Sequence, residues 1–291
     1  MTTTICVINL KGGVAKTTTT VATAQVLAGV HGKKVLIIDL DPQTNASIML
    51  VGEDRWEELN DAGHTVAQLF RDALEPKNRR FDIGQAVQTK VGNVSDARTV
   101  SLLSSSLDLI AIQDKLASMP RGQYYSDSPI DVLRKSVKPI LGEYDVVLID
   151  CPPSLGLVTL NGLRIADGFM IPVVPDFLST YGIPQILERV ESFSRDIVEP
   201  IAPFGILATK FQLNSTVHKN QLKDLRANVS ARLNVPVFDT VIPQANDLSA
   251  AAEYSPTSKT LRQKWGYGDA FKAYLAFAEE LLTKVVEVAS K

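Results

Sequence analysis

Two lysines, two glycines and two threonines gather near the start of the chain, in the run Lys11-Gly12-Gly13-Val14-Ala15-Lys16-Thr17-Thr18. An apolar strand-like run precedes it and a helix-like stretch follows. Backbone N–H groups and the dipole at such a helix start attract an anion. Gly12 and Gly13 remove Cβ atoms where a phosphate must approach the backbone. We therefore expect Lys16 to neutralise the β and γ phosphates of a nucleotide and the Thr17 hydroxyl to ligate Mg²⁺.

Carboxylates follow two other apolar runs. Asp39 and Asp41 end the run 35–38, and Asp150 ends the run 146–149. Ligands of open α/β sheets bind at the carboxyl ends of the strands, and a buried carboxylate is costly unless it is paired or near a metal. The sequence thus predicts a phosphate and Mg²⁺ site, although Asp39 and Asp41 are also suited to capping the next helix.

The elements that must hold these residues are visible as apolar runs. The predicted strands are 5–8, 35–38, 146–149, 169–174 and 204–208, with another at 237–242 and one near Val100–Leu103. The predicted helices are 17–30, 182–197 and 215–233. Continuously apolar strands that alternate with helices are typical of a doubly wound α/β fold, with a mostly parallel sheet and helices on both faces.

The remainder is interpreted as part of one P-loop domain over 1–291. The polar stretch of about 51–138 is predicted to elaborate this domain, and the amphipathic stretch of about 270–289 to be a C-terminal helix packed on it.

Composition narrows the class of protein. The chain has 291 residues, a formal net charge of −2 and 45% hydrophobic residues, so it is globular and does not coat nucleic acid by overall charge. Cys6 and Cys151 make no disulfide framework and suit a reducing cytosol. With no secretory leader and no apolar run of eighteen residues, we expect a cytoplasmic protein.

The glycine-rich loop departs from the pattern G-x-x-x-x-G-K-[ST], because the two glycine positions fall on Leu10 and Ala15. The pattern K-G-G-x-x-K-T resembles the deviant Walker A box of the ParA/MinD superfamily of ATPases, in which an additional lysine, here Lys11, opens the loop. Ala15 replaces the glycine most often seen there, so a Cβ must be tolerated at this position.

The acidic runs strengthen this resemblance. The run D-x-D-P-Q that begins at Asp39 is similar to the Walker A′ motif, which implies that Asp41 orients the attacking water and that Asp39 lies near Mg²⁺. The strand that ends at Asp150 resembles a Walker B strand, which implies that Asp150 holds Mg²⁺ through a water. The segment 150–161 resembles the switch that reports loss of the γ-phosphate.

The resemblance implies an ATP- and Mg²⁺-dependent homodimer in which Lys11 reaches the partner's site and acts with Lys16 and Asp41 in slow, partner-stimulated hydrolysis. By analogy, the base lies against Thr209, Lys210 and Pro243. Such proteins position a plasmid, a chromosome region or a protein assembly by non-specific DNA binding at the nucleoid, with a ParB-like or small basic adaptor protein as partner. The nucleotide-binding residues expected are Lys11, Gly12, Gly13, Val14, Ala15, Lys16, Thr17, Thr18, Thr209, Lys210 and Pro243.

The DNA contact has several candidates. Gln244 and Asp247 stand where the family carries arginines, which weakens the expectation at this loop. Two other basic groups are available, each of which is also consistent with a solvated helix face. They are Lys210, Lys219, Lys223, Arg226 and Arg232, and Lys259, Arg262 and Lys264.

Two other functions compete. A synthetase or reductase of the same fold would activate a small substrate with ATP, but it needs a second pocket, for which the sequence shows no candidate residues. A MinD-like protein would bind membranes through a basic amphipathic tail, whereas the tail here mixes lysines and glutamates, so no membrane partner is expected.

Overall fold

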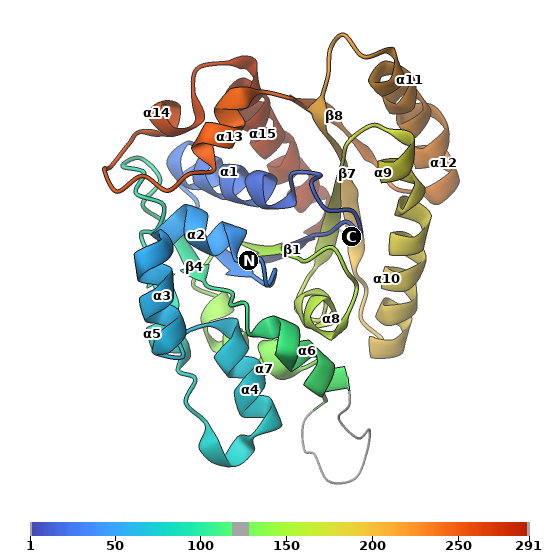
Figure 1. The fold of residues 1–291 in the computed structure, drawn as a ribbon. Coiled ribbons are helices and arrows are strands. Elements are labelled where there is room, and N and C mark those ends of the chain that lie inside the picture. Colours follow the sequence, from blue (N-terminus) through green and yellow to red (C-terminus); the bar gives the residue numbers. More distant parts are fainter. Residues whose placement is uncertain (1, 118–127, 290–291) are drawn as a thin grey trace.

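The computed structural model describes residues 2–117 and 128–289 (Figure 1). One eight-stranded sheet has the order β3-β4-β2-β5-β1-β6-β7-β8. All neighbouring strands are parallel except β3 and β4. The strands are β1 (Thr3–Val7), β2 (Val35–Asp39), β3 (Val87–Thr89), β4 (Val100–Leu103), β5 (Val146–Asp150), β6 (Gly168–Val173), β7 (Ala202–Phe211) and β8 (Val237–Pro243).

Helices cover both faces of the sheet (Figure 1). They are α1 (Lys16–Gly29), α2 (Asn45–Val51), α3 (Glu53–Asp61), α4 (Val66–Leu74), α5 (Ile83–Ala86), α6 (Leu109–Ala117), α7 (Val132–Leu141), α8 (Leu157–Leu163), α9 (Phe177–Tyr181), α10 (Ile183–Ile197), α11 (Thr216–Asp224), α12 (Ser230–Leu233), α13 (Asn246–Ala251), α14 (Leu261–Trp265) and α15 (Asp269–Ala289), with a 3₁₀ turn at Pro76–Asn78 and a π-helical segment at Leu225–Val229.

Two hydrophobic cores lie on opposite faces of the sheet. On β1, Ile5 and Val7 join the core beneath α1 and α15, whereas Cys6, together with Ile8 just after the strand, joins the core beneath α4, α7 and α10. Side chains of a strand alternate between faces, and here both faces are apolar, which explains why these strands read as continuous apolar runs. The predicted doubly wound, mostly parallel α/β fold is confirmed.

The structure differs from the sequence prediction at two places. β3 was not predicted, because its three residues are partly exposed and carry no apolar run. The stretch 215–233, predicted as one helix, is interrupted by the π-helical segment Leu225–Val229 between α11 and α12. Within the stretch 51–138, β3 and β4 extend the sheet, while residues 118–127 lie outside the described residues.

The C-terminal helix α15 packs on β8, α1 and β7. The rings of Phe277 and Phe238 meet edge to face, 4.9 Å apart. Tyr274 lies beside Trp265, and its hydroxyl is 3.2 Å from Thr19 Oγ1 on α1. α15 therefore fixes α1, the helix that begins at the glycine-rich loop. In the described part of the chain, no helix has the length and apolar character needed to cross a membrane.

Candidate nucleotide site

The sheet brings the predicted acidic residues together at its carboxyl edge. Asp150, at the end of β5, is in register with Asp39 at the end of β2 and with Val7 at the end of β1. The glycine-rich loop follows β1 and leads into α1, so the loop and both carboxylates share one edge. This convergence depends on the placement of β5 between β1 and β2.

The loop is open toward the solvent where a phosphate would lie. A Cβ built on Gly12 or on Gly13 meets no atom within 4 Å, and Gly13 has a φ of +75°. Ala15, immediately before α1, has a φ of 61° and a ψ of 31°, which is the left-handed region that glycine adopts without cost. The Cβ at position 15 is thus accommodated, at the cost of backbone strain.

Side chains from the core of the sheet hold the loop in place. Asn9 donates to the carbonyl of Pro172 at 2.8 Å and accepts the backbone N–H of Lys11 at 2.9 Å. The buried Thr209 hydroxyl lies 3.0 Å from the carbonyl of Val14 and 3.1 Å from that of Val173. These contacts pre-organise the loop before any ligand binds.

Lys16 folds back across the loop. Its Nζ donates to the carbonyl of Lys11 at 3.1 Å, and the side chain is largely buried. Burial lowers the pKa of Lys16, and the nearby carboxylates of Asp150 and Asp41 oppose this shift. An anionic phosphate at the loop would favour the charged ammonium further.

Asp150, the predicted Mg²⁺ carboxylate, is fully buried and lies beside the hydroxyls of Thr17 and Thr20. Burial raises its pKa to about 7, while hydrogen bonds from Thr17 and Thr20 and the charge of Lys16 oppose the shift. Its Oδ1 lies 3.4 Å from Thr20 Oγ1, but its Oδ2 is buried and finds no hydrogen-bond partner within residues 2–117 and 128–289. A buried carboxylate oxygen without a partner fits a hydrated cation, and Thr17 supplies a second oxygen beside it.

Asp39 and Asp41 differ in the hydrogen bonds that their carboxylate oxygens accept. Both oxygens of Asp39 are occupied: Oδ1 accepts the Asp41 N–H at 3.1 Å, and Oδ2 accepts the N–H and hydroxyl of Ser47 at 2.9 Å and 2.7 Å. Asp39 thus caps α2, and burial, followed by the Asp150 charge, raises its pKa well above the usual value. Asp41 Oδ1 accepts the Gln43 N–H at 2.9 Å, and Oδ2 accepts no hydrogen bond from the residues that the structure describes.

Lys11 is held within its own chain. Its Nζ lies 3.3 Å and 3.4 Å from the two oxygens of Asp176 and donates to Ser179 Oγ at 2.9 Å. Asp176 also caps α9 by accepting the Ser179 N–H at 2.7 Å. Hydrogen bonds from Ser179 and from Lys11 lower the pKa of Asp176, against the effect of its partial burial.

The structure adds residues that the sequence reasoning missed. Asp176 follows β6 closely, as Asp150 ends β5, so the rule of strand-end carboxylates could have identified it. Asn9, Thr20, Ser47 and Ser179 carry no motif of their own. Of the residues predicted to contact the base, Thr209 supports the loop, Lys210 is exposed with a φ of 48°, and Pro243 ends β8.

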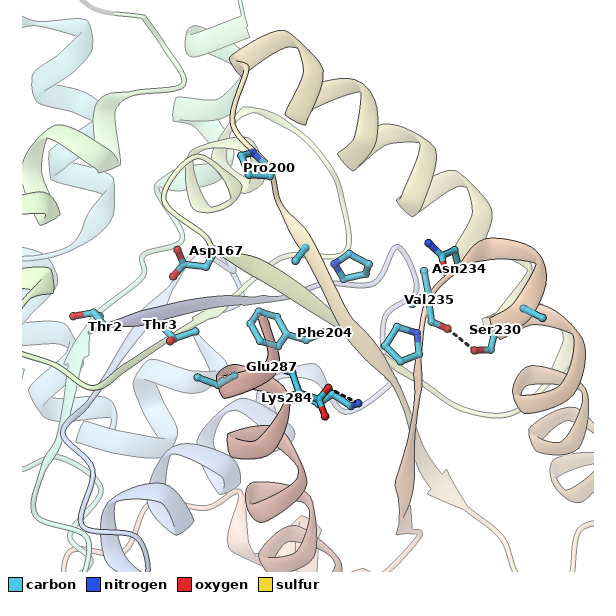
Figure 2. Close-up of a pocket in the computed structure, with 15 residues that line it drawn as sticks. Thr2, Thr3, Asp167, Pro200, Phe204, Ser230, Asn234, Val235, Lys284 and Glu287 are labelled. Carbon is cyan, nitrogen blue, oxygen red and sulfur yellow. Dashed lines mark hydrogen bonds and ion pairs between the residues drawn. The ribbon is translucent and has the colours of Figure 1, made fainter. Parts of the chain in front are cut away.

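A separate cavity of about 950 Å³ lies where the strands begin, at the amino edge of the sheet (Figure 2). Its lining includes Thr3 at the start of β1, Asp167 before β6 and Phe204 near the start of β7. On its α15 side, Lys284 donates to Glu287 at 2.9 Å. A rise of about 3.3 Å per residue along β1 places this cavity at least about 13 Å from the edge that carries Asp150.

Comparison with known proteins agrees with this geometry. A family model described as an AAA domain matches residues 2–202. The chromosome partitioning protein ParA of Myxococcus xanthus is 26% identical over 281 residues, which cover 96% of this chain and 88% of that protein.

Two solved structures share the fold. Cobyrinic acid a,c-diamide synthase from Mycobacterium smegmatis is 27% identical, with a TM-score of 0.71 and coverage of 97% of this chain and 94% of that one. McdA from Cyanothece is 23% identical, with a TM-score of 0.71 and coverage of 97% and 96%, and it supports the fold alone. The chain belongs to the AAA domain family and, within it, to the ParA-type ATPases.

Proposed function

We propose that the protein is an ATP-dependent switch ATPase that dimerises around bound nucleotide and positions a cargo. The observation that carries this proposal is the meeting of Lys16, Asp41 and Asp150 at one sheet edge. There, Asp150 Oδ2 is buried and has no hydrogen-bond partner among the described residues. Such an arrangement of a lysine, an open glycine loop and carboxylates suits a phosphate chain with Mg²⁺.

ATP and Mg²⁺ are the proposed ligands. The synthase from Mycobacterium smegmatis has been crystallised with ADP and magnesium and with an ATP analogue and magnesium, which supports this assignment. Thr17 and Asp150 would hold the cation, which neutralises charge on the phosphates. Lys16 and the amides of the loop would bind the phosphates. Asp41, whose Oδ2 accepts no hydrogen bond among the described residues, would orient the attacking water.

In the proposed dimer, Lys11 would have a role that it does not have in the single chain. In the single chain, Asp176 and Ser179 hold its ammonium at the mouth of the loop. We propose that Lys11 exchanges these contacts for the phosphates bound to a second copy, as a charge supplied in trans. Hydrolysis would then be slow in the isolated protein and would be stimulated by a ParB-like or small basic partner.

The test is the oligomeric state of wild type and Lys11→Ala with ATP and Mg²⁺. The mass of wild type, measured by light scattering, should double with ATP and not with ADP, while Lys11→Ala should stay monomeric because it lacks the trans charge. Lys115→Ala, which removes a lysine from α6, is the matched control and should dimerise. A Lys11→Ala protein that dimerises like wild type would contradict the switch.

The cargo function rests on the resemblance to partitioning proteins. The Myxococcus xanthus relative is named a chromosome partitioning protein, and its similarity covers nearly the whole of both chains. We propose ATP-dependent, non-specific DNA binding at the nucleoid of a cytoplasmic protein, with a plasmid, a chromosome region or a protein assembly as cargo.

A synthetase remains the second candidate, because the Mycobacterium smegmatis synthase is 27% identical. Such an enzyme must place its substrate in reach of the γ-phosphate. The 950 Å³ cavity, whose lining residues are drawn in Figure 2, lies at the amino ends of the strands. The loop and Asp150 lie at their carboxyl ends. A substrate held there could not be activated by ATP at the carboxyl edge, which favours the switch.

A further inference from the structure

Ser47, in the first turn of α2, links two parts of the carboxyl edge of the sheet. The residue is fully buried. Its hydroxyl donates to Asp39 Oδ2 at 2.7 Å and accepts the backbone N–H of Ser105 at 2.9 Å. Its own backbone N–H donates to the same Asp39 oxygen at 2.9 Å. Ser47 therefore joins the end of β2 to the segment that follows β4, and α2 lies beside β4 in the fold (Figure 1).

The segment after β4 is itself held in place. Ser105 is fully buried, and its carbonyl accepts the indole N–H of Trp56 on α3 at 3.0 Å. The carbonyl of Ser104 accepts the N–H of Val66, at the start of α4, at 2.9 Å. Because α3 and α4 both fix this segment, the N–H that Ser105 presents to Ser47 is a rigid support.

On its other side, Ser47 fixes the carboxylate that holds the backbone of Asp41. Two hydrogen bonds from Ser47 converge on Asp39 Oδ2, and Asp39 Oδ1 accepts the Asp41 N–H at 3.1 Å. The preceding N–H, of Leu40, donates to the carbonyl of Asp150 at 2.9 Å. The direction in which the Asp41 side chain leaves the backbone is therefore set by Asp39 and by the end of β5.

We infer that Ser47 is a positioning residue for ATP hydrolysis and acts through Asp39 on the carboxylate of Asp41. This inference rests on the proposed function, because it assigns a support to the residue proposed to orient the attacking water. The Ser47 hydroxyl is engaged by Asp39 and Ser105, so its effect on the reaction passes through them. A small displacement of a reacting group slows turnover much more than it weakens binding of a nucleotide held by other residues.

Ser47→Ala tests this role. The variant keeps the backbone N–H that donates to Asp39, but it removes the hydroxyl, so Asp39 loses one anchor and the Ser105 N–H loses its acceptor. Turnover is measured as phosphate release with Mg²⁺ and saturating ATP. We expect it to fall about 10- to 100-fold, with the affinity for ATP by calorimetry and the dimerisation by light scattering within about twofold of wild type.

Ser104→Ala is the matched control. Ser104 is as buried as Ser47, but its hydroxyl has no hydrogen-bond partner among the described residues, so its removal should leave turnover unchanged. Ser47→Thr keeps a hydroxyl and should recover most of the lost turnover. Urea unfolding shows whether each variant is folded in the assay. If Ser47→Ala does not fold, Ser47→Cys takes its place and should also be slow, because a thiol is a weak donor.

A second measurement asks whether Ser47 acts through Asp41. In a single-turnover assay, Asp41→Ala/Ser47→Ala should hydrolyse ATP no more slowly than Asp41→Ala, because the group that Ser47 supports is already gone. A serine with a merely structural role would slow hydrolysis by the same factor in both backgrounds.

The outcomes separate this inference from the proposed function. If wild type hydrolyses ATP and Ser47→Ala matches it, or if the effects of the two substitutions multiply, the inference fails and the switch stands. If Ser47→Ala loses affinity for ATP in proportion to turnover, Ser47 supports the site as a whole and the inference is overturned. If wild type releases no phosphate from ATP, the proposed ATPase activity fails, and the role of Ser47 fails with it.

Discussion

Lys16 and Lys264 are both buried, but among the described residues only Lys16 has carboxylates nearby that compensate its charge. Lys16 and Lys264 are each only 7% exposed, and burial lowers the pKa of both. Asp150 and Asp41 compensate the charge of Lys16. The Lys264 ammonium has no hydrogen-bond partner in the described part of the chain and lies near the like charge of Lys259. The first lysine belongs to a site, and the second costs stability.

This difference predicts that Lys264→Met stabilises the protein at pH 7. The pKa of Lys264 falls from 10.5 to about 8, so the unfolded chain binds more protons between these values and stability rises with pH there. Below pH 8 the ammonium is charged in both states and the full penalty is present. Removing it should raise the free energy of unfolding by about 2 to 3 kcal/mol at pH 7 and by little near pH 10.

Urea unfolding at the two pH values checks this expectation. Lys272→Met on α15 is the control, because that ammonium is exposed and pairs with Asp269 at 3.0 Å. The control should change stability by less than about 0.5 kcal/mol. A Lys264→Met protein that unfolds more easily at pH 7 would show that the buried ammonium is stabilised after all.

The sequence was most informative about single residues within motifs. Lys16, Asp39, Asp41 and Asp150 share one edge because each follows a buried strand, and this relation can be predicted from local pattern alone. Pairings between distant segments could not be predicted. Lys11 and Asp176 are 165 positions apart, and their contact depends on β6 lying beside β1 in the sheet.

At the scale of elements, burial decided which predictions succeeded. β1, β2 and β5 are buried along their whole length, so their apolar runs predicted them. β3 pairs antiparallel at the edge of the sheet and is partly exposed, so its three residues gave no signal. The π-helical segment was missed because periodicity does not distinguish one inserted residue in a helix.

The packing of α15 on the sheet gives an element-scale prediction. Phe277 is fully buried and meets Phe238 of β8, 4.9 Å away. Phe277→Ala should therefore lower the free energy of unfolding by about 3 to 5 kcal/mol, through lost burial and the cavity left behind. Thr283→Ala, on an exposed position of the same helix, should change it by less than about 0.5 kcal/mol. Equal effects in a urea titration would mean that α15 does not stabilise the fold.

At the scale of the whole molecule, the two edges of the sheet differ in chemistry. The carboxyl edge carries the glycine-rich loop and the buried carboxylates, and the amino edge carries the cavity lined by Thr3, Asp167 and Phe204. The net charge of −2 gives no sign of local positive charge. Three cations, Lys219, Lys223 and Arg226, line one small hollow on α11 and the π-helical segment that follows it. In the proposed dimer, a nucleotide at the carboxyl edge would be enclosed by a second copy that closes on that edge.

This arrangement predicts that Asp41→Ala traps the dimer. The variant keeps Lys11, Lys16 and Asp150, so it should bind ATP and assemble, but turnover should fall by about 10²-fold or more because no carboxylate orients the water. Light scattering after a pulse of ATP should show a wild-type dimer that decays and a variant dimer that persists. Asp41 also accepts the Gln43 N–H at 2.9 Å, so Asp41→Asn, which keeps an acceptor for that turn, separates chemistry from local structure. Wild-type turnover in both variants would assign the water to another group, and loss of the dimer in Asp41→Ala alone would assign Asp41 to the turn.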